Sequence, residues 1–213
     1  MYKRQQYVYS KSIDDAGLGG SASGLVAQNW LNLSGERGLS PFDQRHVVTL
    51  TAQYSTGVGV HGGTLMSGWR GAIFKGWTVV TNVNAATGLP MSPIYGVPVP
   101  DTTNLNQRPE YTGAALYDAP GGRFLNPLAY EAPVTGQWGN AGRNTITGPG
   151  QFSFNANMAR TFASKLDLTI SSTNPLNHVV ITGWYNTVTS SQFGLPSAAN
   201  GMRSLQVQMR WRF

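Results

Sequence analysis

The residues that could carry chemistry in this chain are few and scattered. His46, His61 and His178 lie far apart in the sequence and lack the spacing of metal ligands. There is no cysteine, which excludes disulfides and thiolate metal sites. Nine acidic residues give no Ser-His-Asp or paired-carboxylate arrangement. The sequence therefore indicates no catalytic residue, no metal site, no cofactor and no enzymatic activity, and it does not identify ligand-binding residues.

Two groups of loop residues are candidate calcium ligands. Asp14 with Asp15, or Asp101 with Asn104 and Asn106, offer oxygen atoms of the kind that calcium prefers, but without the spacing of an EF-hand. We interpret them as polar loop tips.

The segment 57–62 (GVGVHG) matches a dinucleotide-binding fingerprint by letter. That motif requires a strand before it and a helix after it in a βαβ unit. No helix is predicted in this segment, so a turn is favoured.

The chain has a net charge of +6, but its Lys and Arg residues are dispersed, which does not indicate nucleic-acid binding.

The last ten residues are the clearest structural signal. Their side chains alternate strictly in polarity, as in a strand with one apolar and one polar face. The apolar set is Leu205, Val207, Met209, Trp211 and Phe213, and the polar set is Ser204, Gln206, Gln208, Arg210 and Arg212. Such a strand suits a soluble sandwich, where the apolar face meets a core. It also suits a membrane barrel, where that face meets lipid and Gln206, Gln208, Arg210 and Arg212 line a wet lumen.

The composition fits a barrel with a polar lumenal face, and it also fits a secreted β protein rich in Gly and Asn. Charged residues are 11% of the chain, against roughly 25% in a typical soluble domain. No apolar run approaches the roughly 18 residues of a spanning helix. The N-terminus lacks the apolar region of a signal peptide, which a barrel needs for export. We therefore expect the chain to be the tail of a longer protein.

The arrangement of strands and loops gives the strongest argument. Strands are predicted near 5–13, 43–54, 76–87, 151–162, 165–173 and 203–213. The connections 14–42, 88–150 and 174–202 are long and would lie on one side, whereas 55–68 and 163–165 are shorter and would lie on the other. Outer-membrane barrels sort their loops in this way, and soluble sandwiches have no reason to. Six strands cannot close a barrel, so the predicted fold is an incomplete antiparallel transmembrane β-barrel of the all-β class.

Two side-chain groups fit this fold. Asp43 and Arg45 share a parity at the predicted outer rim, which predicts a structural ion pair. Aromatic residues lie near predicted strand ends and suggest an interfacial girdle, with carbohydrate stacking as the rival interpretation; they are Trp69, Trp77, Trp184, Tyr185 and Trp211.

The order of short motifs resembles the C-terminal barrel portion of Oar-like TonB-dependent outer-membrane transporters. The matching pieces are YSKSIDD at 9–15, FDQRH at 42–46, GW at 76–77, TGLP at 87–90, FLNP at 124–127, GNAGRN at 139–144, GPG at 148–150 and the aromatic C-terminus. The segment 174–178 (NPLNH) departs from the family, and Pro175 is expected to end a strand there. The resemblance covers nearly all of residues 7–213 and implies about six strands of a barrel of about 22.

The resemblance also implies the partners and the location. These are outer-membrane lipid, the barrel assembly machinery through the C-terminal strand, and TonB through an N-terminal part that this sequence lacks. The expected function is energy-coupled uptake of large nutrients across the bacterial outer membrane, with no activity from the fragment alone. The alternative is a soluble or surface-attached β-sandwich module that binds carbohydrate.

Overall fold

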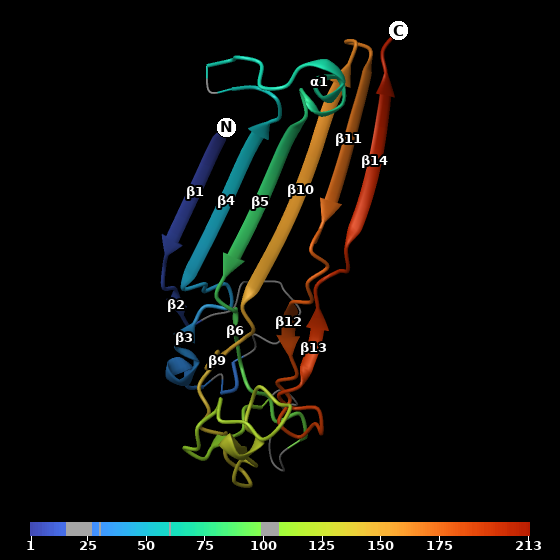
Figure 1. The fold of residues 1–213 in the computed structure, drawn as a ribbon. Coiled ribbons are helices and arrows are strands. Elements are labelled where there is room, and N and C mark those ends of the chain that lie inside the picture. The colour runs from blue at the N-terminus through green and yellow to red at the C-terminus, as the bar shows by residue number, and fades with distance from the viewer. Residues whose placement is uncertain (16–26, 30, 60, 99–106) are drawn as a thin grey trace.

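The main element of the fold is one six-stranded antiparallel sheet (Figure 1). It belongs to a computed structural model that describes residues 1–15, 27–29, 31–59, 61–98 and 107–213. The strands, in their order across the sheet, are β1 (Tyr2–Tyr9), β4 (His46–Ser55), β5 (Thr78–Ala86), β10 (Gln151–Phe162), β11 (Leu166–Thr173) and β14 (Ser204–Trp211). The sheet is open, because β1 and β14 form its two edges.

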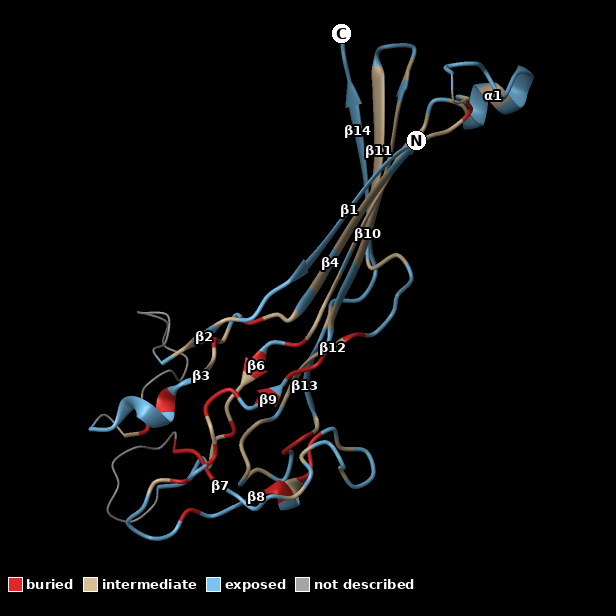
Figure 2. Ribbon diagram, turned by 90° about the vertical axis from the view of Figure 1, so that its left-hand side faces the viewer, coloured by how far each residue is buried: buried red, intermediate tan, exposed pale blue. Residues whose placement is uncertain are grey.

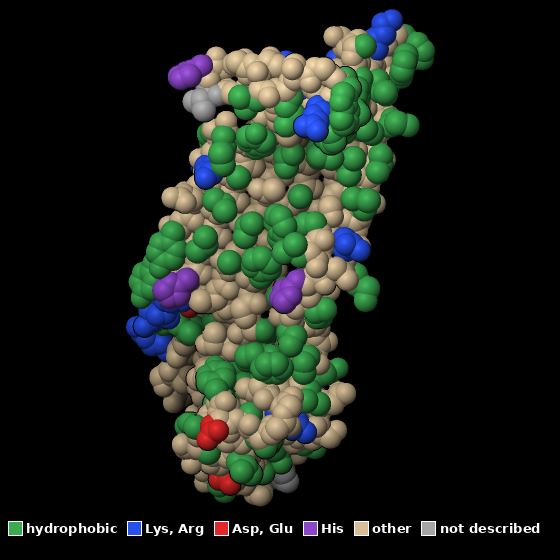
Figure 3. Space-filling model, in the orientation of Figure 1, with side chains coloured by type: hydrophobic (Ala, Val, Ile, Leu, Met, Phe, Trp, Pro, Cys, Tyr) green, Lys and Arg blue, Asp and Glu red, His purple; other side chains and the backbone are tan. Residues whose placement is uncertain are grey.

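The register gives the sheet one apolar face. Directly opposed residues share a face, and Val207 lies opposite Ile170, which lies opposite Met158. The hydrophobic members of this face are Val48, Leu50, Ala52, Tyr54, Val79, Val83, Ala85, Phe152, Phe154, Ala156, Met158, Phe162, Leu166, Leu168, Ile170, Leu205, Val207, Met209 and Trp211. Hydrophobic side chains cover this face in the view of Figure 3. Strand β1 departs from the pattern, since Lys3 and Gln5 share the face of Tyr7 and Tyr9.

The opposite face consists mostly of neutral polar side chains. Its central members are Thr49, Thr51, Gln53, Asn82, Asn84, Ser153, Asn155, Asn157, Thr169, Ser171, Gln206 and Gln208. Several bond across strands: the Thr51 hydroxyl donates to Asn82 Oδ1 at 2.9 Å, and Asn157 Nδ2 donates to Ser171 Oγ at 2.8 Å. The sheet therefore has one mainly apolar face and one mainly polar face.

The connections are sorted by length between the two ends of the sheet. The segments 10–45, 87–150 and 174–203 lie at one end, and 56–77, 163–165 and both termini lie at the other (Figure 1). The short turn uses left-handed backbone at Ala163 (φ 47°) and Ser164 (φ 58°). This is the distribution that the alternation of long and short connections predicts.

The described parts of the three long segments are folded, contrary to the prediction of plain loops. They contain the strand pairs β2 (Ile13–Asp14) with β3 (Gly38–Leu39), β6 (Pro90–Met91) with β9 (Ile146–Thr147), β7 (Glu110–Tyr111) with β8 (Tyr130–Glu131) and β12 (Ile181–Trp184) with β13 (Pro196–Ala199), and the 3₁₀ helices Leu33–Glu36 and Pro127–Ala129. We call this body the loop domain. The buried hydrophobic residues of the described chain all lie in it (Figure 2), and they are Leu125, Ala129, Tyr130, Ala141, Ile146, Val180 and Phe193.

Strand β1 departs from its predicted boundaries, whereas β11 ends where the sequence predicted. Strand β1 runs from Tyr2 to Tyr9 rather than near 5–13, because its partner β4 begins at His46, opposite Tyr9. Strand β11 ends at Thr173, just before the Asn174-Pro175 step, as Pro175 led us to expect.

The short connection contains a helix that the sequence did not reveal. Helix α1 (Gly68–Phe74) follows the glycine-rich stretch that begins at Gly57. The flanking strands β4 and β5 pair antiparallel, so the dinucleotide-type βαβ unit is absent from this part of the structure. Within the described residues, no helix has the length and hydrophobicity needed to cross a bilayer.

Candidate functional site

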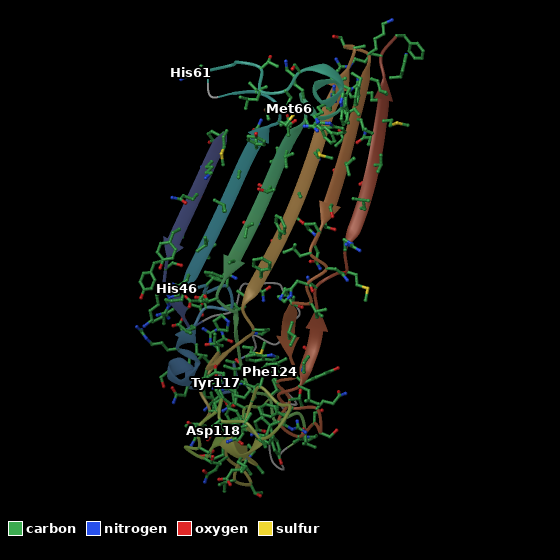
Figure 4. The ribbon with its side chains drawn as sticks, in the orientation of Figure 1. His46, His61, Met66, Tyr117, Asp118 and Phe124 are labelled. Carbon is green, nitrogen blue, oxygen red and sulfur yellow. The ribbon has the colours of Figure 1, made fainter. Side chains whose placement is uncertain are left out.

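The apolar face is bounded at both ends by aromatic residues. Trp77, Phe162 and Trp211 lie at the α1 end, where the Trp77 and Phe162 rings meet edge to face at 6.0 Å. At the other end are Tyr7 and Tyr9, whose rings lie 6.1 and 5.3 Å from that of His46 (Figure 4). Along β10, Phe152 and Phe162 are roughly 34 Å apart at about 3.4 Å per residue. At a tilt near 45° this is roughly 24 Å, close to the apolar band of an outer-membrane barrel, about 25 Å tall.

The terminal strand continues both faces. Leu205, Val207, Met209 and Trp211 lie opposite Ser172, Ile170, Leu168 and Leu166, whereas Gln206, Gln208 and Arg210 lie opposite Ser171, Thr169 and Asp167. Phe213 and Arg212 lie beyond the end of β14, and Arg212 pairs with Asp167 at 2.6 Å. The assignment of the two sets to lipid and lumen remains a prediction.

The polar face is hollowed near the α1 end. A depression of about 500 Å³ lies between β5, β10, β11 and β14, and Thr169, Gln208, Arg210 and Asp167 are among its lining residues. Two of the residues predicted to face the lumen, Gln208 and Arg210, are thus brought together on a concave polar surface.

Buried ionic contacts join the first and second long segments. Arg108 pairs with Glu36 at 2.8 Å, and both side chains are buried. Both side chains have further hydrogen bonds. Glu36 Oε1 accepts from the backbone N–H of Gln28 at 3.0 Å, and Arg108 Nε donates to the Ala141 carbonyl at 2.7 Å. Arg143 extends this network, because its Nε donates to the Glu36 carbonyl at 2.6 Å. We call Gln28, Glu36, Arg108 and Arg143 the loop clamp.

The clamp reaches Asp14, which the sequence suggested as a calcium ligand. Arg143 forms an ion pair and hydrogen bond with the Asp14 carboxylate. A hydrogen bond from the Ser40 side chain, and then Arg143, lower the pKa of Asp14 below its ordinary value. Asp14 is therefore an ionised partner of arginine. The described residues hold no cluster of three or more His, Cys, Asp or Glu side chains placed for a metal, and Asp101, Asn104 and Asn106 lie outside them.

The second and third segments share the hydrophobic core. Phe193 packs edge to face on Tyr130 at 6.0 Å, and the Trp184 ring stacks on Phe124 at 5.3 Å. Arg123 donates to the carbonyls of Phe193 and Ser191. Trp184 therefore belongs to the loop domain and not to the interfacial girdle that the sequence suggested.

A cavity of about 390 Å³ opens beside this core. It is lined by Tyr111, Leu116, Tyr117, Tyr130, Asn140, Ala141, Gly142 and Thr145. Burial raises the pKa of Tyr130, so its phenol stays neutral at physiological pH. Tyr117 and the neighbouring Asp118 lie in the loop domain, at the lower end of the molecule in Figure 4. The cavity is aromatic and neutral, which suits binding rather than acid–base chemistry.

Three further candidates, Asp43, Arg45 and His46, have structural partners. Arg45 lies 3.7 Å from the Asp43 carboxylate, which confirms the predicted ion pair. Asp43 Oδ1 also accepts from the Ser12 amide at 2.6 Å, fixing the end of the first segment. His46 Nδ1 bonds the Tyr7 hydroxyl at 2.8 Å. The cavity and the clamp had no signal in the sequence. The clamp joins positions as far as 115 residues apart, from Gln28 to Arg143, and the cavity residues within 111–145 show no regular spacing.

These features define a class of protein: an antiparallel wall with an apolar band of bilayer height, a polar opposite face and long folded loops at one end. A comparison with family models agrees. Residues 3–206 match the model described as "Outer membrane beta barrel domain", and the chain belongs to this family. It is accordingly a protein of the bacterial outer membrane. Comparisons with curated proteins and with solved structures found no match.

Proposed function

We propose that this chain forms the C-terminal wall of the barrel of a TonB-dependent receptor that takes up large nutrients across the outer membrane. The observation that carries the proposal is the relation of the loop domain to the polar face. Helix α1 projects from the apolar side of the sheet, whereas the loop domain extends toward the opposite side (Figure 2). A folded body over the lumenal side is what a receptor needs to capture a ligand before transport.

The open edges of the sheet require further strands. Both β1 and β14 present unpaired backbone groups along one side, and in lipid each such group costs several kcal/mol. The motif order noted in the sequence supports a single larger barrel of about 22 strands, with these six at its C-terminal end. In that barrel β14 engages the assembly machinery, and a plug domain with the TonB contact precedes β1 in the full-length protein.

The tyrosine cavity is the proposed point of ligand capture. Tyr111, Tyr117 and Tyr130 present aromatic surface that can stack on a ring of the ligand. The loop clamp holds the second long segment, which carries all three, against the first. The soluble carbohydrate-binding module is not favoured, because the chain belongs to a family of outer-membrane β-barrel domains.

The test uses the intact gene product with an epitope inserted after Asp118, an exposed position in the loop domain. The epitope should be detected on whole cells, and the denatured band should be far larger than the 22.9 kDa of this chain. Solubilised protein should bind an immobilised periplasmic domain of TonB, whereas a porin control should not. A denatured band near 22.9 kDa, or failure to bind TonB, would contradict the proposal.

Ligand capture is tested separately by Tyr117→Ala. Growth on the nutrient mixture that requires the receptor should fall at limiting concentration while the amount of protein in the membrane is unchanged. Lys11→Ala, an exposed change in the loop domain away from the cavity, is the matched control. Equal growth of the two variants would remove the cavity from the uptake path.

A further inference from the structure

Helix α1 carries apolar side chains that nothing in the described structure covers. Trp69 is 68% exposed, Ile73 53% and Phe74 52%, and the preceding Leu65 and Met66 are also exposed. Exposed hydrophobic clusters of this kind usually mark a contact surface. Met66 lies at the top of the sheet beside α1 (Figure 4), at the end that also holds both termini.

Contacts with the sheet fix the side on which α1 lies. Arg160 is a member of the apolar face of β10, since it lies opposite Leu168. Its guanidinium donates to the carbonyls of Ile73 at 2.5 Å and Ala72 at 2.7 Å, in the last turn of α1. Trp77 Nε1 donates to the same Ile73 carbonyl at 2.9 Å. Helix α1 is thus anchored on the apolar side, at the level of the aromatic row formed by Trp77, Phe162 and Trp211.

The anchor also explains a charge on the apolar face. An arginine facing hydrocarbon is costly unless its charge and donors are satisfied. Arg160 stacks on the rings of Phe162 and Trp77, at 4.4 and 6.0 Å, and meets carbonyls at the negative end of the helix dipole. The same contacts hold the last turn of α1 against the sheet.

The charge pattern favours an anionic partner. Residues 44–100 contain no Asp or Glu, whereas α1 carries Arg70, followed by Lys75 at its C-cap. Arg70 lies over the Trp69 ring at 5.5 Å, and Lys75 Nζ donates to Thr64 Oγ1 at 2.8 Å. Short amphipathic helices with aromatic and aliphatic residues on one side and cations beside them bind at the headgroup level of anionic membranes.

We propose that residues 65–75 form an interfacial anchor in the periplasmic leaflet of the outer membrane, with Trp69, Ile73 and Phe74 among the lipid chains and Arg70 and Lys75 at anionic phosphate groups. The anchor extends the apolar face of the sheet at the end where Trp77, Phe162 and Trp211 lie. Short connections of outer-membrane barrels face the periplasm, which places the anchor in the phospholipid leaflet. The inference goes beyond transport and rests on the membrane location, not on coupling to TonB.

The test exploits the absence of cysteine from this chain. Trp69→Cys and Ile73→Cys, each in the full-length protein, are labelled with an environment-sensitive nitrobenzoxadiazole dye and reconstituted into vesicles of phosphatidylethanolamine and phosphatidylglycerol. Lys165→Cys, in the other short connection, is the matched control. At positions 69 and 73 we expect blue-shifted emission, quenching by lipids with a nitroxide at acyl carbon 5, and protection from iodide. At position 165 we expect quenching by iodide alone.

The role of the cations has its own readout. The double substitution Arg70→Gln and Lys75→Gln should reduce nitroxide quenching at position 73 in the anionic vesicles. The protein with Arg70 and Lys75 intact should show the same reduction in vesicles of phosphatidylcholine alone. Iodide quenching at 69 and 73 equal to that at 165 would overturn the proposal. Protection from both iodide and the lipid nitroxide would also overturn it, because a protein partner would then cover α1.

Discussion

None of the residues in the six long strands is buried, whereas every buried hydrophobic residue of the described chain lies in the loop domain. The loop domain packs as a water-soluble domain does, with an apolar core and a bonded ionic clamp. The sheet shows most of its apolar residues on one face and most of its polar residues on the other. The loop domain has a protein interior, and the contrast supports the prediction that one face of the sheet meets hydrocarbon and the other meets water.

The largest effect is expected where the loop domain depends on a buried charge pair. Arg108→Ala leaves Glu36 buried without its partner, and we expect a loss of about 3–5 kcal/mol from the stability of the loop domain. Hydrogen exchange at the Ile146 and Phe193 amides should accelerate accordingly, while exchange in β10 stays unchanged. Arg212→Ala breaks the exposed pair with Asp167 and should cost less than about 1 kcal/mol. Equal effects of the two variants would contradict the contrast.

The next effect separates the two faces of the sheet. Met158→Arg places a charge near the middle of the apolar band, and we expect a loss of about 2–4 kcal/mol in the stability of the folded barrel. Asn157→Arg, the adjacent residue on the polar face, should cost much less because its side chain meets water. Urea titration of the barrel in vesicles measures the free energy of unfolding of both variants. A larger cost for Asn157→Arg would reverse the assignment of the faces.

A smaller effect concerns the turn between β10 and β11. Ala163 has a left-handed backbone (φ 47°), which disfavours a residue with a Cβ by roughly 1–2 kcal/mol. Ala163→Gly should therefore slow unfolding of the sheet without changing the loop domain. Lys165→Gly lies at a position without a positive φ and should weaken the same turn slightly. Faster unfolding with Ala163→Gly than with Lys165→Gly would show that the turn is unstrained.

The smallest effect is a pH dependence confined to the loop domain. The pKa of Asp14 is lower in the folded state than its ordinary value of 3.8. Its ion pair with Arg143 therefore contributes stability above about pH 3.8, and this contribution is lost as pH falls through the folded value. Exchange at the Gly38 and Leu39 amides, corrected for the intrinsic rate, should rise below that pH. Asp14→Asn should remove this dependence, and its persistence in that variant would assign it to another group.

The sheet could be predicted from the sequence because its signal is local. Strand β10 occupies 151–162, the range that the strict period of two indicated. The loop domain could not be predicted, because Leu125, Ile146 and Phe193 are separated by turn residues and show no period. Likewise, the contact of Arg108 with Glu36 joins residues that are 72 positions apart.

Helix α1 was missed for a different reason. Two of its seven residues, Gly68 and Gly71, weigh against a helix by propensity, and tertiary contacts with Arg160 and Trp77 outweigh that preference. The apolar stretch around Trp69 could have been noticed as an amphipathic segment, but its glycines favoured a turn.

The central claim is that the sheet separates hydrocarbon from water, and β14 tests it most directly. Single cysteines at positions 204–211 of the full-length protein, labelled with a nitroxide in vesicles, report accessibility to oxygen and to a water-soluble nickel chelate. We predict a period of two, with oxygen accessibility highest at 205, 207, 209 and 211 and chelate accessibility highest at 204, 206, 208 and 210. Equal chelate accessibility along the strand, or low accessibility to both reagents at 205, 207 and 209, would contradict the account.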